Sequence, residues 1–570
     1  MKIDWDVPIR MDDGLVLRAD VFRPEEGKHP AILSYGPYGK GLAFQEGYKT
    51  AWEIMARENP DALAGSSNRY QNWEAVDPEK WVPEGYVCVR VDSRGAGRSP
   101  GYLAHNNARE TRDIYECIEW TAKQPWCSGK IGMDGISYYA SNQWRAAAAQ
   151  PPHLAAICAW EGWNDAYRES ARHGGIICSF RKNWQDMQVK TVQHGVGERG
   201  KKNPNTGELV CGPETLGEAE LEKNREDMWQ AFLSRELDGA YYRERSADLS
   251  KVKTPLLTAA NWGGQGLHTR GNFEGFVGAA SQQKWLEVHG GSHWAPFYTD
   301  YGRNLQLEFF DHFLKGSDNG WDRQSRVLLN VRSPGERFVL RSEHEWPLAR
   351  TRWTPFYLDP QGLQLSRDAP RSTASLTYDP VGDGLSFSTP PLRAEMELTG
   401  PSALKLFVSS ATTDADLFIV LRVFAPDGKT AGKEVLFQGA LDPKTPVAQG
   451  WLRASHRKLD RQRSLPYRPF HTHDEKQPLK PGEPVELDIE IWPTCIVVPA
   501  GYRIALSIRG RDYEHDEPAA SLSNMKNPMK GCGPFTHDDE TDRPPQIFGG
   551  KVTLYFERQP FVLLPVIPAN

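Results

Sequence analysis

The chain has 570 residues, too many for a single hydrophobic core, so about two or three domains are expected. Its formal net charge of -6 and the lack of a basic run exclude a nucleic-acid-binding footprint. We recognise no secretory signal at the N-terminus and no apolar run of membrane-spanning length. The eight cysteines have no metal-ligand or disulfide-framework spacing, so we expect small buried hydrophobes in a cytoplasmic protein.

Strand and helix patterns alternate in the first part of the chain. A helix is predicted at 109–124, and a second one runs from Tyr138 to Gln150, where two prolines stop it. Apolar, strand-like runs occur at 15–22, 30–35, 86–91, 130–135 and 154–160. This alternation predicts a parallel sheet that is covered by helices on both faces.

The pattern changes between Asp165 and about Ser250, where the sequence is charged and mostly helical. We interpret this segment as a helical cap inserted into the first domain. The sheet resumes at 255–260 and 284–288, and a last amphipathic helix at 305–314 ends with a glycine cap.

Short alternating runs replace the helices after about Gly335. They lie at 403–408, 417–424, 485–491, 502–508 and 551–556, and turns such as Pro426-Asp427-Gly428 and Pro481-Gly482 separate them. Strands of this length predict a β-sandwich of the jelly-roll type. We therefore expect an α/β-hydrolase domain at 1–165 and 250–334, a helical cap at 166–249, and an all-β jelly-roll domain at 335–570.

Ser137 lies between a predicted buried strand and a predicted helix, in the segment Gly135-Ile136-Ser137-Tyr138-Tyr139-Ala140. A serine at such a turn is held in a strained elbow that exposes its hydroxyl. The segment departs from the usual G-x-S-x-G pattern, because Tyr139 stands where the second glycine would be. The motif alone therefore leaves both a nucleophile and an ordinary turn serine open.

A serine hydroxyl needs a base to remove its proton, and the base is expected on a loop after a late strand. His293 is the best candidate, because it follows the strand at 284–288 after a glycine-rich turn. His289 is its main rival, but its position favours the end of the strand. Weaker cases are His268, which has no catalytic spacing, and His471 and His473, which we expect to be exposed loop residues.

Several motifs, in chain order, resemble the CocE/NonD hydrolases, a group that includes bacterial cocaine esterases, α-amino acid ester hydrolases and X-Pro dipeptidyl peptidases. The resemblance covers nearly the whole chain. The segments that carry it are Pro37-Tyr38, 92–99, the elbow at 135–140, 309–316, and in the β half 411–418 and 450–455.

The resemblance implies a role for each matching position. Ser137 matches the nucleophile of the family and His293 its general base. Tyr38 matches the oxyanion-hole tyrosine, with the backbone N–H of Tyr138 as the second donor; on the residues alone, Tyr38 reads as a packing tyrosine. The implied acyl-transfer chemistry needs neither a metal nor an organic cofactor.

The triad acid is the one part that does not match. The family places an aspartate in a turn after the strand at 255–260, but here Trp262 is followed by two glycines. Glu161 directly follows the strand at 154–160, which puts its carboxylate on the same edge of the sheet as Ser137. Glu161 is therefore our first choice, and Glu274, expected as a helix-face charge, is the second.

These residues predict a serine hydrolase that cleaves an ester or amide bond of a small-molecule substrate through an acyl-enzyme on Ser137. The alternatives are an X-Pro dipeptidyl peptidase, an acyltransferase that uses the same serine, and a binding protein whose catalytic site has decayed. We expect no nucleic-acid or membrane partner. Large β-domain surfaces are compatible with a homodimer.

Overall fold

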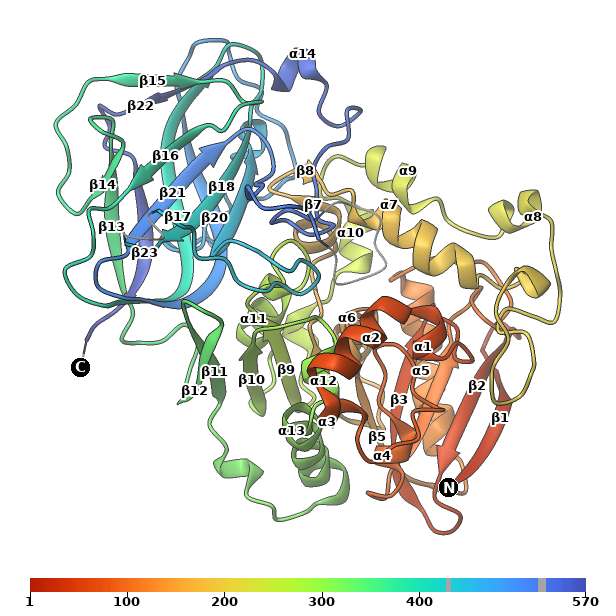
Figure 1. Cartoon of the computed structure of the whole chain (residues 1–570). Helices are drawn as coiled ribbons and strands as arrows, with labels where there is room; N and C mark the ends of the chain where they lie inside the picture. The colour runs from red at the N-terminus through yellow and green to blue at the C-terminus, as the bar shows by residue number, and fades with distance from the viewer. Residues whose placement is uncertain (427–431, 521–528, 570) are drawn as a thin grey trace.

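The computed structural model describes residues 1–426, 432–520 and 529–569. Figure 1 shows a lobe of mixed helices and strands, coloured red to green, beside a β-rich lobe coloured teal to blue. The predicted turn at Pro426-Asp427-Gly428 lies mostly outside the described residues. None of the helices in the described ranges combines the length and the apolar character that a membrane crossing requires.

A twisted, mostly parallel sheet forms the centre of the first lobe. Its spatial order follows from the pairings β1-β2-β4-β3-β5-β6-β9-β10-β11, in which the strands from β4 to β11 run parallel. The bounds are β1 Lys2–Arg10, β2 Val16–Arg23, β3 His29–Gly36, β4 Val87–Asp92, β5 Cys127–Ile136, β6 Leu154–Trp160, β9 Leu256–Asn261, β10 Lys284–His289 and β11 Val327–Ser333. The predicted α/β alternation is confirmed.

Apolar clusters cover both faces of this sheet, as side-chain alternation along a strand requires. Ala31 and Leu33 of β3 join one cluster with helices α5 (Ala108–Ala122) and α6 (Tyr138–Ala148). Ile32, between them, joins another with helices α2 (Lys49–Glu58) and α13 (Asp300–Phe310). The sheet is therefore a buried middle layer, and its strand ends carry the polar side chains described below.

The segment between β6 and β9 consists of short elements rather than long helices. It contains a two-stranded hairpin, β7 (Arg172–His173) and β8 (Ile176–Ile177), which the sequence did not predict. The helical elements are η1 Ala166–Ala171, α7 Phe180–Trp184, η2 Gln185–Val189, η3 Lys190–Val192, η4 Gly197–Arg199, α8 Glu218–Lys223, α9 Met228–Leu233, α10 Ala240–Arg245 and η5 Leu249–Lys251. In Figure 1 this segment, coloured yellow, borders the β-rich lobe.

The second lobe is built from antiparallel strands. The longest ones, β17 (Met396–Ser410) and β20 (Val485–Val498), pair along most of their length. The others include β13 Arg352–Asp359, β18 Asp416–Phe424, β19 Ala448–Arg453, β21 Arg503–Arg509, β22 Val552–Tyr555 and β23 Phe561–Ile567. Alternate residues of these strands form one apolar core. The expectation of an all-β C-terminal region is therefore confirmed.

Two smaller expectations had different outcomes. All eight cysteines are buried and free, as predicted. His471 and His473 were predicted to be exposed, which is wrong: they are 5% and 3% exposed. The reason is long-range packing, because the ring of His473 lies 4.9 Å from that of Tyr167 in the inserted segment.

Candidate active site

Ser137 forms the sharp turn between β5 and α6. Its backbone adopts φ 58° and ψ -108°, a left-handed conformation that L-residues rarely adopt and that costs about 1–3 kcal/mol. The Ser137 amide donates to the backbone carbonyls of Trp160 and Glu161, each at 3.1 Å, so the neighbouring β6 end holds the turn in place. Strain that the surroundings maintain in this way is typical of a nucleophile elbow.

The departure from G-x-S-x-G at Tyr139 has a structural compensation. The Tyr139 ring lies over Gly36, where an added Cβ would come within 2.6 Å of the ring. An added Cβ on Gly135, which has φ 151°, would lie 2.5 Å from the Cβ of Tyr139. The room that the second glycine of the motif usually supplies is therefore provided by glycines on β3 and β5.

The hydroxyl of Ser137 contacts a histidine for which no catalytic role was predicted. Its Oγ lies 3.1 Å from Nε2 of His268, the residue just before helix α11 (Thr269–Gly278). Burial, reinforced by the neighbouring His293, lowers the pKa of His268 well below its usual value. His268 is therefore neutral near pH 7 and can accept a hydrogen bond from the serine.

His293 pairs with Glu161. Its Nδ1 lies 2.8 Å from Oε2 of Glu161, and its Nε2 lies 2.9 Å from Oε1 of Glu74. Burial by itself lowers the pKa of His293, but Glu161 and then Glu74 outweigh it and raise this pKa to about 10. The His268 and His293 rings are parallel, with centroids 5.0 Å apart, so both imidazoles lie beside the serine.

Glu161 sits at the carboxyl end of β6 with φ 48° and is completely buried. Its Oε1 accepts from Nδ2 of Asn261 at 3.1 Å and lies 3.0 Å from Nε2 of His289. Burial alone would raise the pKa of Glu161, but His293 and His289 lower it to about 2. The carboxylate is therefore ionised, and it lies between the rings of His293 and His289.

The two rival candidates have other partners. His289, the alternative base, lies at the end of β10, as expected, and its Nδ1 is 2.7 Å from Glu287. Glu274, the alternative acid, forms an ion pair with Arg468 at 2.8 Å and does not line the serine pocket.

Glu74 is a buried carboxylate that sequence reasoning missed. It has φ 62°, and burial raises its pKa to about 7. Its Oε2 makes no well-aligned hydrogen bond with any described residue, although the neighbouring Trp73 side chain lowers its pKa slightly. A lone acid between Trp73 and the apolar pair Ala75-Val76 was the only signal in the sequence.

Of the two predicted oxyanion donors, Tyr38 lines the serine pocket and Tyr138 follows the serine in the chain. Tyr38 accepts a hydrogen bond at Oη from Nε1 of Trp184 at 3.0 Å, which leaves its own proton free to donate. Burial, reinforced by Glu74, raises the pKa of Tyr38 well above its usual value, so the hydroxyl stays protonated. The hydroxyl of Tyr138 donates to Glu110, so only its backbone amide is free to donate. This amide is the first of helix α6 and has no intrahelical acceptor.

Aromatic side chains dominate the pocket around Ser137. Tyr48 and Trp73 stack with their ring centroids 4.2 Å apart. The free space is about 30 Å³, enough for a water molecule and too small for a substrate without local opening. The remaining lining residues are Tyr38, Ala51, Glu74, Phe180, Trp184, Gln188, Leu267, His268, His293 and Leu441.

The C-terminal lobe also contributes to this site. The backbone N–H of His293 donates to the carbonyl of Ala440 at 2.9 Å, and the N–H of Ala440 donates to the carbonyl of Gly263 at 3.0 Å. Leu441 lines the serine pocket. The position of the His293 loop therefore depends on both lobes.

An α/β sheet with a serine elbow and a buried carboxylate-histidine pair at its carboxyl edge is the arrangement of a serine hydrolase. Residues 13–295 match the family model of the X-Pro dipeptidyl-peptidases (S15 family), and residues 319–527 match the model of the X-Pro dipeptidyl-peptidase C-terminal non-catalytic domain.

A solved CocE/NonD family hydrolase from Staphylococcus aureus is 31% identical, with a TM-score of 0.84 over 99% of this chain and 93% of that chain. The cocaine esterase of Rhodococcus sp. is 24% identical over 74% of this chain and 80% of the esterase. A putative serine esterase of Mycobacterium tuberculosis is 24% identical over 89% of this chain and 90% of that protein. The chain belongs to the CocE/NonD family, and it is an enzyme that hydrolyses ester or amide bonds.

Proposed function

We propose that this enzyme cleaves an ester or amide bond of a small-molecule acyl substrate through an acyl-enzyme on Ser137. The observation that carries the proposal is the buried Glu161–His293 pair at 2.8 Å, whose histidine lines the same pocket as Ser137. A histidine whose Nδ1 is held by a carboxylate presents its Nε2 for proton transfer, which is the arrangement of a catalytic triad.

His293 is the proposed general base and Glu161 the acid that orients it. In the arrangement described above, Ser137 Oγ faces His268, and Nε2 of His293 faces Glu74. Rotation of the serine side chain from His268 toward His293 would complete the triad. His268 is the weaker candidate for the base, because Glu161 holds His293 and makes no hydrogen bond to His268 within the described chain.

The proposed reaction has two steps. In the first, Oγ of Ser137 bonds to the substrate carbonyl carbon, and His293 takes the serine proton and passes it to the departing alcohol or amine as its bond breaks. The Tyr38 hydroxyl and the Tyr138 amide hold the oxyanion. In the second step, His293 activates a water molecule, which releases the acid and restores Ser137.

The first experiment is labelling with a fluorophosphonate probe, followed by intact-mass analysis of the wild type and of Ser137→Ala, His293→Ala and His268→Ala. We expect one adduct on the wild type, none on Ser137→Ala, and labelling at least about 100-fold slower for His293→Ala than for His268→Ala. Unchanged labelling of Ser137→Ala would refute the nucleophile. A larger loss for His268→Ala than for His293→Ala would assign the base to His268.

The pocket favours substrates with an apolar or aromatic acyl group, because rings from Tyr48, Trp73 and Trp184 line it. Glu74 supports a second candidate, a peptidase of the X-Pro type, since its unpaired carboxylate oxygen could receive a free α-amine. Curated relatives in Bacillus anthracis and Streptomyces avermitilis are named putative Xaa-Pro dipeptidyl-peptidases. Comparing kcat/KM for phenyl esters and for aminoacyl-prolyl anilides separates the two.

An acyltransferase would use the same serine, so products formed with added alcohol or amine acceptors distinguish it from a hydrolase. The reading as a decayed binding protein has less support, since the named relatives are esterases and peptidases.

Finer aspects of the architecture are also part of the proposal. We expect the β domain at 335–570 to have jelly-roll topology, with the hydrolase domain at 1–165 and 250–334 and the cap at 166–249. We also propose a cytoplasmic enzyme that forms homodimers. Light scattering after size-exclusion chromatography tests the dimer, since a mass of one chain would contradict it.

A further inference from the structure

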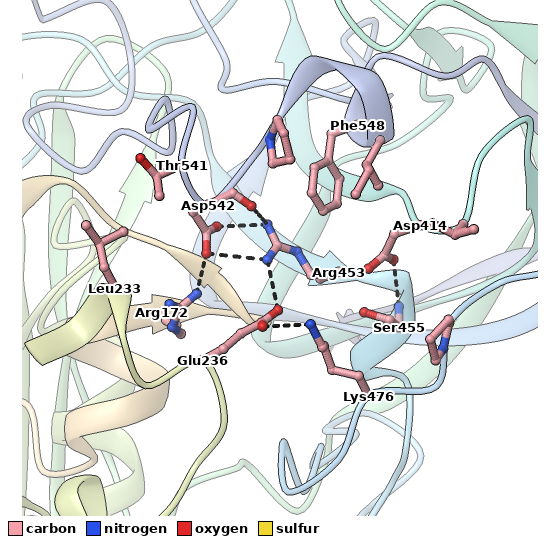
Figure 2. A pocket seen from close by; sticks show the side chains of 14 residues that line it. Arg172, Leu233, Glu236, Asp414, Arg453, Ser455, Lys476, Thr541, Asp542 and Phe548 are labelled. Atoms are coloured by element: carbon pink, nitrogen blue, oxygen red, sulfur yellow. Dashed lines mark hydrogen bonds and ion pairs between the residues drawn. The ribbon is translucent and has the colours of Figure 1, made fainter. Parts of the chain in front are cut away.

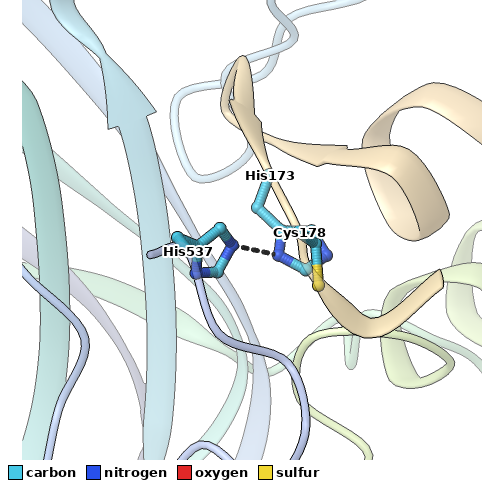
Figure 3. Close-up of side chains that lie close together, drawn as sticks. All are labelled: His173, Cys178 and His537. Atoms are coloured by element: carbon cyan, nitrogen blue, oxygen red, sulfur yellow. Dashed lines mark hydrogen bonds between the residues drawn. The ribbon is translucent and has the colours of Figure 1, made fainter. Parts of the chain in front are cut away.

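A second cluster of nucleophilic and basic side chains lies outside the active site. His173 is on strand β7, Cys178 directly follows strand β8, and His537 comes from the C-terminal lobe. One ligand atom from each lies within 4.8 Å of the others, and all three residues are at most 1% exposed. Figure 3 shows the two imidazoles facing each other, with the Cys178 side chain beside them.

The hydrogen bonds around the two rings restrict the positions of their protons. Nδ1 of His537 lies 2.8 Å from Oδ1 of Asp512, which accepts, so Nδ1 carries the hydrogen. Nε2 of His173 faces the carbonyl oxygen of Glu169 at 3.4 Å, and the ring also interacts with the backbone of Gly266. Nδ1 of His173 lies 2.7 Å from Nε2 of His537, so in the tautomer of His173 that carries its proton on Nδ1 this proton lies between the two rings.

In the other neutral tautomer of His173 the proton lies on Nε2, which faces the carbonyl oxygen of Glu169. Both facing nitrogens then present lone pairs. A metal ion can take the place of the shared proton in this form, because neutral imidazole nitrogens are the form in which histidine binds metals.

We propose that His173, Cys178 and His537 bind a divalent transition-metal ion of the zinc class. Imidazole nitrogen and thiolate sulfur are the ligand types that Zn²⁺ prefers. Binding breaks the S–H bond of Cys178, and its proton leaves to solvent as the thiolate coordinates. Tetrahedral geometry requires the two nitrogens to separate to about 3.3 Å, a small opening, with a water molecule as the fourth ligand.

The surroundings of the cluster resemble the outer shell of a metal site. Asp512 accepts two hydrogen bonds from His537, one from Nδ1 of the ring and one from the backbone N–H at 2.6 Å. These bonds fix the tautomer and the orientation of the ring. Burial raises the pKa of the Cys178 thiol to about 12, a shift that the backbone of Phe180 opposes, so the thiolate forms together with metal binding. The net charge of a divalent ion, one thiolate and the Asp512 carboxylate is zero, as a buried site requires.

The site would fasten the inserted segment to the C-terminal lobe. The two segments already run side by side at this point, because the N–H of Ser179 donates to the carbonyl of Thr536 at 2.8 Å. Cys178 also leads directly into helix α7, whose Phe180 and Trp184 line the serine pocket. A bound ion would therefore hold one wall of the pocket without taking part in the reaction.

Sequence spacing gave no hint of this site, and no metal was expected. His173 and His537 are 364 residues apart, and Cys178 lies outside any Cys-x-x-Cys pattern. Only the docking of the β7–β8 hairpin on the C-terminal lobe brings the three together.

The test uses full-length protein without a histidine tag. After chelation, Zn²⁺ and Co²⁺ are titrated into the wild type, Cys178→Ala and Cys88→Ala; the last removes a buried cysteine of β4, outside the cluster, as a matched control. We expect about one tightly bound ion per chain and, with Co²⁺, a thiolate-to-metal charge-transfer band in the wild type and in Cys88→Ala. Cys178→Ala should lose the band, and Asp512→Asn should bind about 10–100-fold more weakly.

A second group of side chains could also bind the added metal ion, so the experiment must distinguish the two. Ligand atoms of Glu161, His268 and His293 also lie within 4.8 Å of one another, but this group has no sulfur and cannot give the charge-transfer band. If Cys178→Ala does not fold, the melting temperature of the wild type decides: a fall on chelation that Zn²⁺ reverses supports the site. The proposal is overturned if the wild type gives no band, or if Cys178→Ala keeps it.

Discussion

Two regions of this enzyme that contain charged side chains differ in how completely those side chains are paired. Where the inserted segment meets the C-terminal lobe, a cavity of about 300 Å³ is lined by charged residues, most of which form ion pairs (Figure 2). Arg453 contacts Asp416 at 2.9 Å and Asp542 at 2.8 Å, and Asp542 also pairs with Arg172 at 2.6 Å. In the serine pocket, by contrast, one oxygen of Glu74 has no well-aligned partner among the described residues.

Backbone strain is also found in the serine pocket and not at the charged residues of the junction. Ser137, Glu161 and Glu74 all have positive φ, whereas the four charged residues of the junction network do not. Ion pairs mainly avoid the cost of burial and fix how two parts fit together, while backbone strain and a carboxylate oxygen without a hydrogen bond persist where a reaction uses them. Substitutions at the pocket should therefore change activity with little loss of stability, and substitutions at the junction should reduce stability with little change in activity.

The largest effect is expected from Glu161→Gln. The amide keeps the size of the side chain but no longer stabilises a protonated His293, so kcat should fall by about 10⁴-fold. Thermal unfolding should change little by comparison. Glu274→Gln is the matched control, since Glu274 pairs with Arg468 outside the pocket. Equal losses for both variants would remove Glu161 from the triad.

The junction should respond to Arg453→Met. Arg453 is 2% exposed, so its loss leaves Asp416 and Asp542 buried with less compensation, at a cost of about 3–5 kcal/mol in the free energy of unfolding. Activity per folded molecule should stay near that of the wild type. Lys190→Met, which breaks an exposed pair with Asp186, should unfold like the wild type. A loss of kcat without a loss of stability in Arg453→Met would contradict the comparison.

Local patterns explain what the sequence could predict. The strand before Ser137 and the helix after it are encoded by neighbouring residues, and β6 is found at the predicted 154–160. Because parallel strands end at one edge of a sheet, the position of Glu161 beside the serine followed from chain order. The contact between Glu161 and His293 needed the structure.

What the sequence missed depends on contacts between distant segments. Glu74 lies on a loop between β3 and β4, and its carboxylate meets His293 across 219 residues. His268 precedes its helix with no motif around it, and only the path of the 261–268 turn brings its ring to Ser137. The burial of His473 likewise comes from packing against Tyr167, which no local periodicity encodes.

A smaller effect is expected from Tyr38→Phe, which removes one proposed oxyanion donor. The ring and its packing against Trp184 remain, so kcat should fall by about 10²–10³-fold while KM changes little. Tyr48→Phe is the control, because Tyr48 lines the same pocket and stacks on Trp73. If Tyr48→Phe lost as much activity as Tyr38→Phe, the loss would reflect packing rather than oxyanion binding.

The smallest change in rate, and the sharpest test of the role of the Glu74 carboxylate, is expected from Glu74→Gln. His293 acts as a base only after Nε2 has lost its proton, and the Glu74 carboxylate stabilises the protonated form, whose pKa is raised to about 10. Activity should therefore rise with pH as this proton leaves. Replacing the carboxylate by an amide removes part of the stabilisation, so the pKa of His293 falls.

The rising limb of kcat/KM should then move to lower pH by about one pH unit or more, and the variant should be faster than the wild type in mildly acidic solution. Glu161→Gln also lowers the pKa of His293, but it loses activity at every pH, which separates the two carboxylates. A Glu74→Gln profile that coincides with the wild type would show that Glu74 does not control this proton. A profile reduced equally at all pH values would instead indicate that Glu74 binds the substrate.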